Sequence, residues 1–126
     1  MKEFSQKEID ERVAVLKRFK ILLETQRNKF QEYLNVLEKQ ESSIENEDAE
    51  SLKIHTEIEN EVVNNIKNLQ KVIVPMSELY NSSSKEFFSS QSEEKSLDYL
   101  YKELSVLKEK VQNQNEKNRA LFKVKM

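Results

Sequence analysis

The chain has 126 residues, of which 35% are charged and 37% are apolar, and its net charge is −2. It contains no glycine, no cysteine and a single proline, Pro75, a composition that favours long helices and excludes disulfides, glycine-rich phosphate loops and a large globular core. The nearly neutral charge argues against a nucleic-acid-binding surface, because phosphate neutralisation needs a strongly basic face.

The first predicted helix begins between Ser5 and Ile9 and runs to the region of residue 44. Its apolar residues recur at heptad spacing, at Ile9, Leu16, Leu23, Phe30, Leu37 and Ile44. The second seam position is polar at Lys20, Arg27 and Glu41, while other apolar residues widen the stripe. We therefore expect this helix to pack against two partner helices, as in a bundle.

The apolar pattern breaks across residues 45–49, where Asn46 and Asp48 are suited to a turn and Asp48 can cap the next helix. The second predicted helix carries a stripe that includes Leu52, Ile58, Val62, Ile66, Leu69, Ile73 and Met76. The connection is short, so an antiparallel return along the first helix is expected. Residues 1–80 are thus predicted to form an elongated antiparallel hairpin, kinked near its end by Pro75.

Residues 81–92 are rich in serine and lack an apolar period, which predicts a flexible linker. Phe87 and Phe88 are its exceptions, and we expect them to pack onto the hairpin rather than insert into a partner. A third helix is predicted over residues 93–126, with Ser92 as its N-cap. Its seam comprises Leu97, Leu100, Leu104, Leu107 and Val111, and continues through Gln114 and Asn118 to Leu121. The predicted fold class is all-α.

No site of catalysis is visible, so the chain is not expected to be an enzyme or to hold a metal or cofactor. His55 is the only histidine, and the run that follows it lacks the lysine and glycine of a histidine phosphotransfer motif, so a structural role is expected for it. Residues 38–61 have a local net charge of −7, typical of a solvated helix tip and less often of an acidic docking site. No apolar segment is long enough to span a membrane, and the N-terminus lacks a signal-peptide core. A cytoplasmic protein is expected.

In order along the chain, the sequence resembles the FlgN-type flagellar export chaperones of type III secretion systems. The resemblance extends from Leu16 to Phe122 and rests on Leu22–Glu24 and Leu34 to Glu38, on Asp48–Leu52 after the acidic turn, and most closely on Asn115–Leu121. The chain departs from the family at Glu47, where many members have glycine, and in its serine-rich linker.

The resemblance implies binding to the C-terminal helices of hook-associated proteins, which form the hook–filament junction, and their delivery to the export gate. Helix-in-groove recognition would suit such a role. The residues expected to contact the partner are Leu97, Leu100, Leu104, Leu107 and Val111, with Asn118 and Leu121 added by the resemblance. The alternatives are a third helix that only completes a closed bundle, a structural coiled-coil protein that self-associates, and, third, a phosphotransfer protein that uses His55.

Overall fold

The computed structural model describes residues 5–83 and 91–126, which form three long helices and no strand. These are α1 (Gln6–Glu45), α2 (Ala49–Ser83) and α3 (Gln91–Lys125). The predicted all-α fold is confirmed. Among the described residues, no helix is long and apolar enough to cross a membrane.

Side-chain hydrogen bonds cap the N-termini of α1 and α2. The Ser5 Oγ atom accepts a hydrogen bond from the backbone N–H of Glu8 at 3.2 Å, which satisfies one free donor of the first turn of α1. Asp48 caps α2 as expected, because its Oδ1 accepts from the N–H of Ser51 at 3.0 Å. Between these helices Glu47 has a φ of 52°, in the left-handed region that glycine adopts at least cost.

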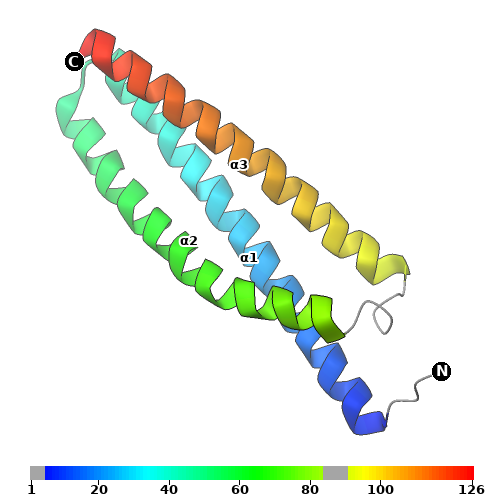
Figure 1. Ribbon diagram of the computed structural model, residues 1–126. Coiled ribbons are helices and arrows are strands. Elements are labelled where there is room, and N and C mark those ends of the chain that lie inside the picture. The colour runs from blue at the N-terminus through cyan, green and yellow to red at the C-terminus, as the bar shows by residue number, and fades with distance from the viewer. Residues whose placement is uncertain (1–4, 84–90) are drawn as a thin grey trace.

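The helix α1 lies in the middle of the bundle, with α2 and α3 packed on it (Figure 1). Hydrogen bonds join Gln26 to Gln70 and Gln40 to Glu59, so α2 runs antiparallel to α1. The α3 helix runs parallel to α1, as the bond from Asn118 to the Leu37 carbonyl and the ion pair of Arg27 with Glu103 require. Among the described residues, α2 and α3 have no Cα atoms within 8 Å of each other.

The core follows the two contacts of α1 and is divided into two clusters along its length. The first cluster consists of Leu16, Phe19, Leu23, Ile73, Leu97, Leu100 and Leu104, and the second of Leu34, Leu37, Leu107 and Val111. Helix α2 contributes one buried residue to the first cluster and none to the second. The apolar core is therefore mainly an interface between α1 and α3.

The predicted linker is too long at both ends. Residues 81–83 belong to α2 and residues 91–92 to α3, so Ser92 lies inside the helix and is not its N-cap. Serine lowers helix stability only modestly, so a serine-rich composition does not by itself end a helix. The remaining residues, 84–90, with Phe87 and Phe88, lie outside the described residues. Helix α2 continues through Pro75, and Figure 1 shows it curving along its course.

Candidate helix-binding groove

The separation of α2 from α3 leaves a groove whose floor is α1, and we call it the α2–α3 groove. It contains two hollows that side chains of all three helices line. The hollow near Pro75 is named the proline-end hollow, and the one near the α1–α2 turn the turn-end hollow. Each is open to solvent, so these are stretches of an open groove and not closed cavities.

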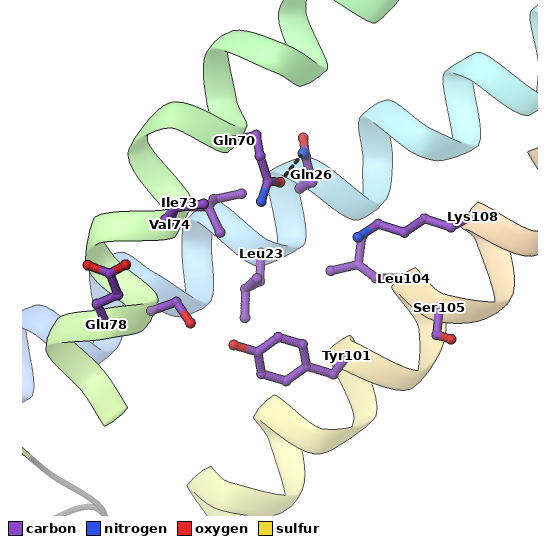
Figure 2. A pocket seen from close by; sticks show the side chains of 11 residues that line it. Leu23, Gln26, Gln70, Ile73, Val74, Glu78, Tyr101, Leu104, Ser105 and Lys108 are labelled. Carbon is purple, nitrogen blue, oxygen red and sulfur yellow. Dashed lines mark hydrogen bonds between the residues drawn. The ribbon is translucent and has the colours of Figure 1, made fainter. Parts of the chain in front are cut away.

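The proline-end hollow has a volume of about 410 Å³. Leu23 and Gln26 of α1 form its floor, and the apolar part of its walls consists of Ile73 and Val74 from α2 and Tyr101 and Leu104 from α3. In Figure 2 the Tyr101 ring and the Leu23 side chain point toward each other across this space. Six of the eleven residues that line the hollow, Gln26 included, are polar or charged, so it presents both apolar and polar groups, as an amphipathic partner would require.

The turn-end hollow has a volume of about 360 Å³ and repeats this arrangement nearer the turn. Its floor contains Gln40 and Ile44 of α1, with Leu52 from α2 on one side and Phe122 from α3 on the other. Phe122 is 45% exposed, a large apolar surface for a solvent-facing residue. The groove therefore offers apolar surface at two separated places.

A polar bridge lies between the two hollows and joins all three helices. The Tyr33 hydroxyl of α1 donates to Glu59 Oε2 of α2 at 3.2 Å and accepts from Asn115 Nδ2 of α3 at 3.1 Å. Gln40 Nε2 also donates to Glu59, at 2.6 Å. Burial, with the nearby Glu59 carboxylate, raises the pKa of Tyr33 above its ordinary value of 10.0. The phenol, which is neutral at pH 7 in any case, donates its proton to Glu59.

The floor of the proline-end hollow holds a buried amide whose hydrogen bonding is incomplete. Gln26 is 2% exposed, and its Nε2 donates to the Ile66 carbonyl at 3.3 Å and to Gln70 Oε1 at 3.1 Å. Its Oε1 has no partner among the described residues. Turning the amide over would set Oε1 against two acceptors, so the observed orientation is the favourable one. The floor thus retains an unused acceptor.

A second polar cluster fixes α3 to α1 near the turn. Glu41 accepts hydrogen bonds from Gln114 Nε2 at 2.8 Å and from Lys117 Nζ at 2.5 Å. The hydrogen bond from Lys117 is the main cause of a lowered Glu41 pKa, and that from Gln114 acts in the same direction. Asn118 is buried beside them, and its Nδ2 donates to the Leu37 carbonyl at 2.8 Å. Part of the acidic stretch therefore serves packing of α3.

The residues predicted to contact a partner lie mainly in the α1–α3 interface. Six of the seven are buried, and Leu121 is half-buried. Of the seven, Leu104 and Asn118 also line the groove. The partner-binding role of the set remains a prediction, and for Leu97, Leu100, Leu107 and Val111 it would require α3 to separate from α1.

His55 is half-buried between α2 and α1. Its Nε2 shares a hydrogen bond with Ser51 Oγ at 3.2 Å, and Ser51 Oγ in turn lies 3.0 Å from Ser43 Oγ of α1. The buried Nδ1 atom has no partner among the described residues. Among all the described residues, no group of three or more histidine or acidic side chains could hold a metal ion.

The polar bridge and the exposed walls of the groove are not apparent from the sequence. Glu59 lies in the acidic stretch of residues 38–61 and Asn115 in the segment that resembles the chaperone family, and neither pattern indicates a contact with Tyr33. Helical periodicity shows which face of a helix is buried, but not which sides of two neighbouring helices face each other. One signal was present, namely the wide stripe on the first helix, which requires two partners.

Comparison with known proteins gives one informative relative. No protein-family model and no solved structure matches the chain. An uncharacterized protein of Treponema pallidum (strain Nichols) is 39% identical over 122 residues, which cover 97% of this chain and 75% of the treponemal protein. Similarity of this extent includes all three helices. The chain therefore belongs to the same family as the treponemal protein.

Proposed function

We propose that the chain is a cytoplasmic helix-binding protein, an export chaperone of the FlgN type. It holds the C-terminal helices of hook-associated proteins in the α2–α3 groove and delivers them to the flagellar type III export apparatus. One observation supports the binding step above the others: α2 and α3 both pack on α1, yet have no Cα atoms within 8 Å of each other in the described residues. The groove is the vacant position of a four-helix bundle.

The physical argument for a helical partner comes from packing geometry. Packed helices lie about 8–10 Å apart, and four-helix bundles surround a shared apolar interior. A fourth helix laid between α2 and α3 would cover Val74, Tyr101 and Phe122, each 43–45% exposed. Burying apolar surface stabilises such a complex by roughly 25 cal/mol per Å² before the costs of association.

The export role rests on the resemblance to the chaperone family. The backbone at Glu47 is compatible with it, because this residue has a φ of 52°, the conformation that the family's glycine adopts without cost. The departure from glycine thus leaves the turn intact. The position of the segment that most resembles the family also suits the role. Residues 115–121 contribute Asn115, Asn118 and Arg119 to the α3 side of the turn-end hollow.

The test is calorimetric titration of the full chain with C-terminal helical peptides of the junction proteins from the same organism. Two variants block the groove without touching the α1–α3 core: Ser105→Trp at the proline-end hollow and Thr56→Trp at the turn-end hollow, both exposed side chains. Ser42→Trp, an exposed residue that lines neither hollow, is the matched control.

We expect saturable binding that the two groove variants weaken at least about tenfold, which is about 1.4 kcal/mol, and that the control leaves unchanged. If both groove variants bind normally, and binding is lost only in a variant whose α3 no longer packs on α1, the site lies in the α1–α3 interface instead. If no junction-protein peptide binds, the chaperone role is wrong.

A second candidate function is self-association through the outer side of α2. Ile54, Ile58 and Val72 follow a helical period on this side and are 41–51% exposed. A structural protein that assembles through them would sediment as an oligomer in the absence of any peptide. Ile58→Lys would return it to a monomer and leave peptide binding unaffected.

A further inference from the structure

The two walls of the α2–α3 groove carry opposite charge. The charged residues that α2 contributes to the two hollows are Glu59 and Glu78. Those that α3 contributes are Lys108, Arg119 and Lys123. Their signs are thus fully separated by helix, although the chain as a whole is nearly neutral. A partner lying in this groove meets an acidic wall on one flank and a basic wall on the other.

Most of these charged side chains are exposed to solvent at the rim of the groove. Glu78, Lys108, Arg119 and Lys123 are all exposed, whereas Glu59 is half-buried and held by Tyr33 and Gln40. Lys108 Nζ lies 5.6 Å from the centre of the Phe30 ring of α1. Exposed rim charges contribute little to affinity individually, but they set the orientation of a bound partner.

The two hollows also fix the spacing of apolar residues on the partner. Their floors are centred near Gln26 and Ile44, which are 18 positions apart on α1, or about 27 Å along the helix. The polar bridge at Tyr33 lies between them. A helix that follows the floor therefore needs two apolar groups separated by about 18 residues, with a polar residue between them.

Direction follows from a property of any helix. If a helix with an apolar stripe facing the floor is reversed end for end, its two flanks exchange places. A helix with acidic residues on one flank and basic residues on the other thus matches the walls in one direction and opposes them in the other. Opposed like charges disfavour the second direction.

We propose that the α2–α3 groove binds an amphipathic helix with one acidic and one basic flank, and that its charged walls select a single direction for that helix. This rests on the proposed function and specifies its partner. The basic flank lies against α2 and the acidic flank against α3. Two apolar groups of the partner occupy the hollows.

The test uses two synthetic helical peptides of about 30 residues, long enough to span both hollows. They share composition and apolar stripe, but their lysine and glutamate flanks are exchanged. The chain has no cysteine, so Lys53→Cys, at an exposed position near the turn, accepts a single donor dye. Each peptide carries the acceptor dye at its N-terminus, and energy transfer reports which end lies near the turn.

We expect both peptides to bind, one with high and the other with low transfer. In the wall-reversal variant Glu78→Lys, Lys108→Glu, Arg119→Glu, Lys123→Glu, the α3 wall becomes acidic and the exposed charge of the α2 wall becomes basic, so the high and low values should exchange. A control peptide with both flanks acidic should bind about tenfold more weakly at low salt. Circular dichroism checks that the variant keeps its helix content.

Equal transfer from both peptides, an unchanged order in the reversal variant, or no binding of either peptide would overturn the proposal. The outcome is separable from that of the proposed function. Junction-protein peptides that bind without a preferred direction would leave the chaperone role and remove the charge selection. Directional binding of the synthetic peptides without affinity for junction-protein peptides would leave the charge selection and remove the chaperone role.

Discussion

The two interfaces of α1 differ in kind. Against α3 it packs a row of five buried apolar residues, Leu97, Leu100, Leu104, Leu107 and Val111. Against α2 the described residues include two, Val62 and Ile73, and half-buried side chains add to this interface, apolar at Leu69 and Met76 and polar at Glu59 and Ser51. The helix joined to α1 by a tight turn thus has fewer fully buried apolar residues in its interface, although both helices pack along α1.

The helix with the shorter connection to α1 is therefore not the one that buries more apolar residues against it. A short turn keeps α2 near α1 at little entropic cost, so its interface needs less apolar burial. The α3 helix follows a longer connection and depends on its own seam for attachment. The groove lies between α2, which has two fully buried apolar residues, and α3, which has five. We expect α2 to be the wall that adjusts when a partner binds.

The largest expected effect comes from truncating one leucine in each interface. Leu100 is 3% exposed in the α1–α3 core, so Leu100→Ala should lower the free energy of unfolding by about 2–5 kcal/mol. Leu69 is half-buried on α2, and Leu69→Ala should cost about half as much. Urea denaturation followed by circular dichroism measures both. Equal losses would show that the two interfaces are equally packed.

A smaller effect is expected from the buried amide of α3. Asn118→Ala removes the donor to the Leu37 carbonyl and the acceptor that Gln114 uses, and should cost about 1–2 kcal/mol. Asn68→Ala, at an exposed position of α2, is the matched control and should change the free energy of unfolding by less than about 0.5 kcal/mol. A neutral Asn118→Ala would mean that this end of the seam is not closed in solution.

The smallest effect is a pH dependence of the α1–α3 interface. The pKa of Glu41 lies below its ordinary value of 4.5 because Lys117 donates to it, so its contribution to stability is present above that value and is lost as pH falls through the lowered pKa. Lys117 has a 62% exposed side chain, so solvent screens the pair. In urea titrations the difference between the native chain and Glu41→Gln should shrink below pH 4.5. A difference that stays constant into acid would contradict the pairing.

Periodicity alone predicted much of the fold. The heptad recurrence of Leu16, Leu23 and Leu37 identified the buried face of α1, and these residues are 0–5% exposed. The seam from Leu97 to Val111 was likewise identified as the apolar face of α3, and all five of its apolar residues are buried. Both results follow from the fact that a helix of 3.6 residues per turn exposes a regular stripe to its partner.

The groove could not be predicted in the same way. Its existence depends on the angle between α2 and α3 around α1, and no residue pattern within one helix encodes that angle. Tyr33, Glu59 and Asn115 meet from three helices, so their bridge follows from the packing and not from local spacing. The helices extend to Ser83 and from Gln91, into the serine-rich stretch, because serine disfavours a helix only modestly.

The most direct test of the open groove is the distance between spin labels placed on the two helices that flank it, outside the lining of the hollows. Lys67→Cys on α2 and Gln112→Cys on α3 are exposed, and the chain has no other cysteine to label. Double electron–electron resonance on the free chain should give one distribution in which α2 and α3 stay apart. If the two labels on the free chain lay as close together as labels on two packed helices, the open groove would be contradicted, because α2 and α3 would then be in contact.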